Sequence, residues 1–151
     1  MLIRLLSIIV QVIVALIMYL SIREIRKDRK RGFLEKRLEE FYIPLIKLFG
    51  HGTLSRGPES HRMVEEIIVS KRHLCGRKVA KVLPQHFTAM MGGSEFYFYF
   101  SSEYEVKRWE DVADTIWDEY VEVLKEYYKI IGVKYYIPPE KPKWMFGVRR
   151  L

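Results

Sequence analysis

The chain has 151 residues, of which 26 are Lys or Arg, 19 are Asp or Glu, and one is Cys. Once an apolar N-terminal stretch is set aside, this length suits one small domain and excludes two full-sized ones. A single cysteine excludes an internal disulfide framework and agrees with a reducing cytoplasmic environment. The lack of Asn, with only two Gln, is typical of proteins adapted to high temperature.

The apolar N-terminal stretch predicts a transmembrane anchor over residues 1–22. Residues 5–22 are 18 consecutive uncharged, mostly aliphatic residues. At about 1.5 Å per residue they span about 27 Å, close to the roughly 30 Å hydrocarbon core of a bilayer. A cleaved signal peptide would need a shorter apolar core and a small-x-small cleavage site, and no such site precedes Arg23. We therefore favour an uncleaved, single-pass anchor in the cell membrane.

A basic collar follows the anchor and predicts its orientation. Only Arg4 precedes the apolar run, so the positive-inside rule places the N-terminus outside and residues 23–151 in the cytoplasm. The same cations are candidates for contact with the anionic membrane surface. The collar consists of Arg23, Arg26, Lys27, Arg29, Lys30 and Arg31.

Gln11 is the one strongly polar side chain inside the apolar run. An amide in hydrocarbon is unfavourable unless another polar group meets it, and such residues join transmembrane helices. Gln11 is therefore a candidate intramembrane contact, although no GxxxG pattern accompanies it. The alternative is that the bilayer merely tolerates a single amide.

The collar continues into a predicted juxtamembrane helix over residues 23–49. Its apolar residues recur at three- and four-residue spacings, which predicts one buried face. Pro44 lacks a backbone N–H and collides with the preceding turn, so we expect a kink or a restart of the helix near that position.

Residues 50–132 are predicted to form a helical cytoplasmic domain. An amphipathic helix after Pro58 is expected to end at Gly76. The aromatic run over residues 96–100, FYFYF, is either core or a contact with the bilayer, and we favour core. The clearest element is a long amphipathic helix over residues 105–131, ended by Gly132. Its polar side carries Glu110, Asp111, Asp114, Asp118, Glu119, Glu122 and Glu126.

Residues 133–151 form a Pro- and aromatic-rich tail that cannot form a regular helix. Such a tail either straps across its own helices or is read by another protein. Together with the acidic helix face it supplies the candidate partner contacts, although a merely solvated face is the alternative. These candidates are Asp114, Asp118, Glu122, Tyr135, Tyr136, Trp144 and Phe146.

No residue pattern specifies a reaction, a metal or a cofactor. The four histidines and Cys75 lack the short spacings of a zinc site, and no glycine-rich phosphate loop is present. Carboxylates four residues apart, such as Asp114 and Asp118, are routine on a helix face. The sequence therefore predicts no metal site, no cofactor and no catalytic residue.

The order of the parts resembles uncharacterised single-pass prokaryotic membrane proteins. The resemblance rests on an aromatic-Tyr-x-Pro-Leu corner at residues 41–45, the pair His73 and Leu74, and a late helix rich in Glu and Tyr. It implies architecture and no chemistry. The predicted fold is all-α: a transmembrane helix followed by three to five cytoplasmic helices.

The predicted function is a membrane-anchored interaction or assembly module of unknown process. It acts by contacts rather than catalysis, with the lipid bilayer and a protein partner or a second copy of the chain as partners. The alternative is a membrane-tethered nucleic-acid-binding protein, although its cations fall into the collar, the segment 62–81 and the tail rather than one stripe. That segment carries Arg62, Lys71, Arg72, Arg77, Lys78 and Lys81.

Overall fold

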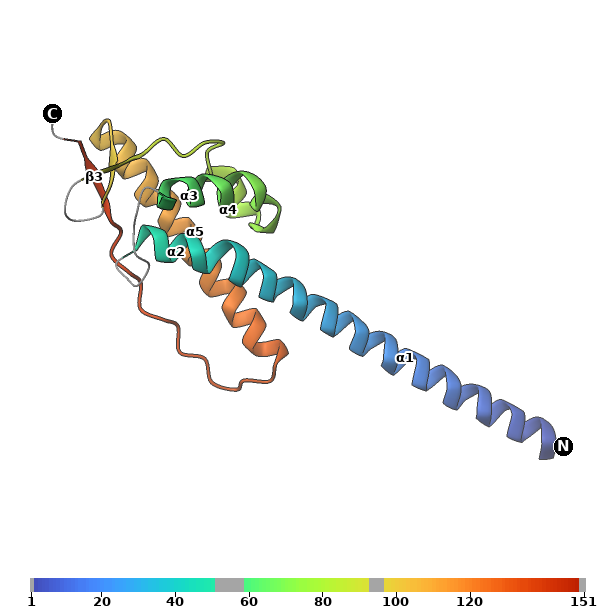
Figure 1. The fold of residues 1–151 in the computed structure, drawn as a ribbon. Helices are drawn as coiled ribbons and strands as arrows, with labels where there is room; N and C mark the ends of the chain where they lie inside the picture. Colours follow the sequence, from blue (N-terminus) through green and yellow to red (C-terminus); the bar gives the residue numbers. More distant parts are fainter. Residues whose placement is uncertain (1, 51–58, 93–96, 150–151) are drawn as a thin grey trace. The chain divides into compact units, whose positions relative to one another are not determined.

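The computed structural model describes residues 2–50, 59–92 and 97–149, and the chain is mostly helical (Figure 1). It divides into two compact units, Met1–Phe33 and Leu34–Leu151. The division falls inside helix α1 (Leu2–Arg37), within the segment that the sequence assigns to a single juxtamembrane helix.

The first unit consists of α1 as far as Phe33, which is the apolar run followed by the basic collar. An 18-residue window of this helix has a mean hydropathy of 2.2, and none of it is buried in the protein. Aliphatic side chains are exposed all around it, from Leu6 to Ile25. A helix that is apolar on every side suits a surrounding of hydrocarbon or of other protein rather than water.

The second unit begins with the last turn of α1, which passes through the π-helical segment η1 (Leu38–Tyr42) into α2 (Ile43–Phe49). The N–H of Ile43 donates to the carbonyl of Leu38, five residues back, directly before Pro44, which has no N–H to donate. Where the sequence predicts a kink, the chain thus stays helical with a widened turn. The side chains of Phe41, Tyr42 and Leu45 are completely buried there.

Three short helices follow: α3 (Glu59–Ser70), the 3-10 turn η2 (Arg72–Leu74) and α4 (Arg77–Val82). The predicted helix end at Gly76 is wrong, because α3 ends at Ser70 and Gly76 instead precedes the first residue of α4. The 3-10 turn between them positions Leu74 in the core, where it is 3% exposed.

The predicted long helix is α5 (Glu103–Ile130). At its start the Ser102 hydroxyl accepts the N–H of Glu105, which satisfies a free donor of the first turn. The Glu105 carboxylate accepts the N–H of Ser101, the residue before the cap. At its end Gly132 adopts φ +84°, and the N–H of Val133 donates to the carbonyl of Tyr128. Such a reversal needs the left-handed conformation that glycine adopts freely.

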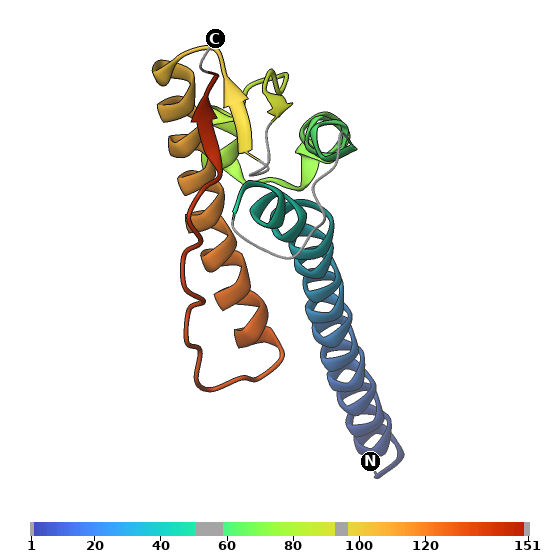
Figure 2. The same ribbon diagram turned by 60° about the vertical axis from the view of Figure 1, so that its left-hand side comes forward.

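The all-α prediction is wrong in one part, since the second unit also contains a three-stranded sheet. It consists of β1 (Met90–Gly92), β2 (Tyr97–Phe100) and β3 (Phe146–Val148), in that order. Strands β1 and β2 are antiparallel, whereas β2 and β3 are parallel and are connected through α5 and the tail. Both views show the tail running back along α5 before β3 reaches the sheet (Figures 1 and 2).

The sheet covers an aromatic core between α2 and α5. The Phe87 ring lies 4.9 Å from the Trp109 ring and 5.0 Å from the Phe98 ring, both edge-to-face. Phe98 and Phe100 are 0% and 1% exposed, so these two residues of the FYFYF run belong to the core. Edge-to-face rings add to the stability that their burial already provides.

Candidate functional site

The acidic helix face binds the chain's own tail. The Trp144 Nε1–H donates to Asp114 Oδ1 at 2.5 Å, and Lys141 Nζ lies 2.6 Å from the same oxygen. Asp114 thus neutralises one tail cation and holds the tail indole. Of the two alternatives for the tail, the structure shows the strap across its own helix for residues 141–148.

Phe146 lies in the core rather than on a partner surface. Its side chain is 8% exposed, with the Phe49 ring 5.3 Å away and the Phe100 ring 5.6 Å away. Trp144 is half-buried over α5. Both aromatics are therefore occupied within the chain, and a partner could reach Phe146 only if β3 left the sheet.

The two remaining acidic candidates, Glu122 and Asp118, differ in their contacts. Glu122 Oε1 lies 2.5 Å from Lys78 Nζ, which ties α5 to α4, whereas Asp118 is exposed. Exposed pairs of this kind contribute little to stability. Asp118 is therefore the predicted acidic contact that the structure leaves most accessible.

The two tail tyrosines also differ. Tyr135 is 89% exposed. The Tyr136 ring packs 5.4 Å from the Tyr128 ring, its hydroxyl is buried without a hydrogen-bond partner among the described residues, and burial raises its pKa. Tyr136 thus faces the helix, and its neighbour faces outward.

The basic collar and Gln11 lie on α1 in the first unit. All six collar side chains, at positions 23, 26, 27 and 29–31, are exposed, as is the Gln11 amide. The collar therefore presents its cations at the surface of the helix.

The cations of the segment 62–81 are largely engaged within the protein. Lys71 Nζ lies 2.8 Å from Glu40 Oε2, and Lys78 pairs with Glu122. The Arg72 guanidinium donates to three carbonyls, those of Ala80, Leu83 and Pro84, at 3.2, 2.9 and 3.1 Å. The other three of the six, Arg62, Arg77 and Lys81, are exposed and make no such contact within the described ranges. A nucleic-acid surface would lose half of its predicted cations to these interactions.

A buried polar cluster that the sequence analysis missed joins α1, η1, α4 and α5. Arg37 Nε donates to the Leu74 carbonyl at 2.7 Å, and its Nη2 donates to the Tyr42 hydroxyl at 2.8 Å. The same Nη2 lies 3.5 Å from Glu119 Oε1. The N–H of Gly76 donates to the Tyr42 hydroxyl at 3.1 Å. Arginine and glutamate are rarely buried unless they are paired in this way.

Glu119 is 6% exposed and so does not belong to the solvated side to which its helical spacing assigned it. Its Oε2 accepts the N–H of Val79 at 3.1 Å, in the first turn of α4. A carboxylate satisfies a free donor at this position and is favoured by the helix dipole. Arg72 supplies the matching cation at the C-terminal end of the same helix, so both ends of α4 are capped by distant side chains.

Burial changes the acidity of two groups in this cluster. It raises the pKa of Tyr42 to about 12, mainly through desolvation. Burial also raises the pKa of the Cys75 thiol, with the nearby Glu119 carboxylate as a second cause. A raised pKa keeps the thiol protonated at neutral pH, and a reactive cysteine requires the opposite shift.

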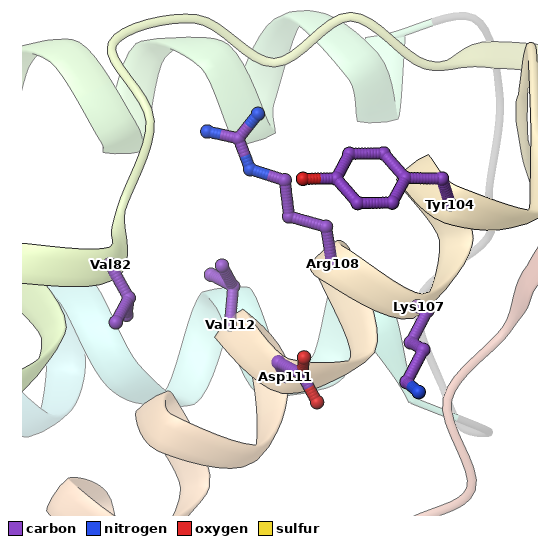
Figure 3. A pocket seen from close by; sticks show the side chains of 6 residues that line it. All are labelled: Val82, Tyr104, Lys107, Arg108, Asp111 and Val112. Atoms are coloured by element: carbon purple, nitrogen blue, oxygen red, sulfur yellow. The ribbon is translucent and has the colours of Figure 1, made fainter.

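A pocket of about 500 Å³ lies between the end of α4 and the first half of α5 (Figure 3). It is lined by Val82, Tyr104, Lys107, Arg108, Asp111 and Val112. Only Val112 is buried, and the side chains of Lys107 and Arg108 point in opposite directions (Figure 3). The polar groups of this pocket do not converge as those of catalytic sites do.

The histidines of the described ranges are dispersed. His61 packs 5.1 Å from the Phe87 ring, His73 is exposed, and His86 Nδ1 lies 3.9 Å from Glu65 Oε1. His51 lies outside the described residues. Within the ranges 2–50, 59–92 and 97–149, no group of three His, Cys, Asp or Glu side chains could hold a metal ion.

The chain is similar to a curated relative and to a solved structure, both from Archaeoglobus fulgidus. A curated protein of Archaeoglobus fulgidus, described as "Uncharacterized protein", is 38% identical over 128 residues, which cover 82% of this chain and 63% of the relative. The chain thus spans less than two thirds of that relative's length. A solved structure described as the C-terminal domain of a protein of unknown function from Archaeoglobus fulgidus is 36% identical. It has a TM-score of 0.71 and covers 79% of this chain and 99% of that chain.

A family model covers most of the second unit. The model is described as "Uncharacterized protein", and it matches residues 32–148. This match extends over more than half of the chain, and the chain belongs to that family.

Proposed function

We propose that this protein is a single-pass membrane protein whose second unit acts through contacts with a protein partner or a second copy of the chain, rather than through catalysis. In this proposal the N-terminus lies outside and residues 23–151 lie in the cytoplasm. The architecture is the one implied by the resemblance to single-pass prokaryotic membrane proteins.

The observation that carries the proposal is the apolar window of α1. Its mean hydropathy is 2.2 over 18 residues, and no part of it is buried within the protein. So large a continuous apolar surface requires a cover, and its length matches the roughly 30 Å core of a bilayer. The six collar cations on its C-terminal side, against Arg4 on the other, support the orientation.

Two features of the second unit support a contact function. The half-buried Arg37 and the buried Glu119 face each other and bond to the backbone at Leu74 and Val79, so they are not directed at a ligand. The pocket beside α5 is lined mainly by exposed side chains. Asp118 and Tyr135 are the predicted contacts that remain accessible for a partner.

Membrane insertion and topology can be tested together in the full chain. Cys75 is the only native cysteine, so a Cys75→Ser background allows one new thiol to be labelled at a time. We expect the protein to stay with membranes in alkaline carbonate. A thiol in Glu110→Cys, on the exposed side of α5, should react with an impermeant maleimide only after the membrane is opened. Release by carbonate would refute the anchor, and labelling of intact cells would refute the orientation.

Self-association through the membrane can be tested at Gln11. If two copies meet through this amide, Gln11→Leu should shift the detergent-solubilised protein toward the monomer. Ser7→Leu, four residues earlier in the same apolar run, is the matched control. An unchanged distribution in Gln11→Leu would exclude this contact and leave the second unit as the contact surface.

A further inference from the structure

The loop that follows α5 exposes alternate apolar side chains. Ile131, Val133, Tyr135 and Ile137 are 40%, 42%, 89% and 88% exposed, although each is large and apolar or aromatic. Residues 131 and 132 form the turn that ends α5, and residues 135–137 continue without helix or strand. These four exposed side chains form the apolar edge of the loop, and Tyr135 and Ile137 are the most exposed of them.

Several contacts hold this edge in place. The N–H groups of Ile131 and Val133 donate to the carbonyls of Tyr127 and Tyr128, which fixes the start of the loop on the end of α5. The intervening Tyr136 packs against the Tyr128 ring, so its two neighbours are directed away from the helix. Pro138 and Pro139 then stiffen the backbone.

The charges around this edge are mainly positive. Lys125 and Lys129 lie in the last turns of α5, Lys134 lies within the loop, and all three are exposed. None of the three makes an ion pair or a hydrogen bond within the part of the chain that the structure describes, whereas Lys71, Lys78 and Lys141 each pair with a carboxylate. Unpaired lysines beside exposed apolar and tyrosine side chains match the chemistry of an anionic bilayer surface, where apolar groups enter and lysines remain at the headgroups.

We propose that the segment Ile131–Ile137 is a second membrane contact, which inserts Tyr135 and Ile137 into the interfacial layer of the bilayer. This inference rests on the proposed anchor, because a tethered domain meets the lipid surface at a high effective concentration. Isolated apolar side chains, which would bind lipid weakly alone, can then contribute to a stable contact. The occupant is lipid rather than a protein groove, since the segment offers a narrow protruding edge with flanking lysines.

The test uses the full chain in vesicles that contain phosphatidylglycerol and phosphatidylcholine. In the Cys75→Ser background, a nitroxide is attached at one of three new cysteines: Ile137→Cys on the edge, Tyr104→Cys at the far end of α5, or Val14→Cys in the anchor. Collision rates with oxygen, which concentrates in lipid, and with a water-soluble nickel chelate report the surroundings of each label. We expect an oxygen-to-nickel ratio at positions 137 and 14 that is several-fold higher than at position 104, where Tyr104 is 76% exposed.

The outcomes separate this inference from the proposed function. A water-like ratio at position 137 with a lipid-like ratio at position 14 would overturn the second contact and leave the anchor intact. Poor access of both reagents at position 137 would indicate a protein-covered site and would also overturn it. A water-like ratio at position 14 would refute the anchor itself. Tyr135→Cys provides a second label on the same edge and should follow position 137.

Discussion

A β-carbon on Gly76 would overlap Oε1 of Glu119. The carboxylate fills the space that a side chain at position 76 would need, and from there it accepts the N–H of Val79. The glycine is therefore required for close approach and not for its backbone angles, since its φ of −85° is available to any residue.

Gly76→Ala should lower the free energy of unfolding by about 3 kcal/mol, because the overlap must displace a buried charged group. Chemical unfolding in detergent, followed by tryptophan fluorescence, measures the change. Gly32→Ala is the matched control: nothing lies within 4 Å of its β-carbon position, and alanine favours a helix. Equal stability of the two variants would contradict the packing argument.

Glu119→Gln should destabilise the second unit by about 2 kcal/mol, because it removes the carboxylate charge that faces Arg37 and takes a negative charge from the start of α4. Arg37 is 14% exposed at its side chain, so solvent replaces little of that loss. Thermal unfolding compared with Asp118→Asn, an exposed neighbour, is the measurement. A loss of stability in Asp118→Asn as large as in Glu119→Gln would show that the position of the charge is irrelevant.

Tyr42 should make the protein less stable at high pH. Its pKa is raised from 10.0 to about 12 by burial, so between these values the unfolded chain releases a proton that the folded chain retains. The unfolding free energy should fall as the pH rises from 10 toward 12, whereas the contribution is complete below pH 10. Unfolding midpoints of Tyr42→Phe should depend less steeply on pH over this range. Tyr104→Phe, at an exposed tyrosine, should retain the steeper dependence of the original chain.

The tail strap should be measurable as a coupling between Trp144 and Asp114. In a double-mutant cycle of Trp144→Phe and Asp114→Ala, we expect a coupling energy of about 1 kcal/mol from the lost hydrogen bond. Glu110→Ala, one turn earlier on α5, should be additive with Trp144→Phe. A coupling near zero in the first cycle would mean that the indole is held by packing alone.

The sequence predicts the long helices well because residues close together in the sequence determine them. The apolar stripe of α5, from Trp109 to Ile130, repeats over about six turns, and Gly132 follows its end, so periodicity and the helix-ending glycine agree. The same periodicity misplaced Glu119, which lies beside the apolar stripe and is buried by α4 rather than by its own helix. Only knowledge of which element packs there could have shown this.

The sheet could not be predicted from local pattern. Its strands have three or four residues, and the parallel partner of Phe98 is Phe146, so the pairing crosses the whole of α5. The FYFYF run also lacks the alternation of apolar and polar residues that marks a half-buried strand. The tail aromatics predicted either a strap across the chain's own helices or a peptide for a partner. In the structure Trp144 and Phe146 face inward, as in a strap, while Tyr135 faces outward.

Helix α4 has only six residues, too few to persist alone in water, and Gly76, which precedes it, has no side chain to cap its first turn. Its first turn depends on a carboxylate 40 residues later, and its last turn depends on the guanidinium of Arg72. We therefore expect α4 to become helical only once α5 has docked. The amide hydrogens of α4 should therefore exchange with solvent deuterium only when the whole domain opens. Their exchange rate would then report whether α5 is packed against α4.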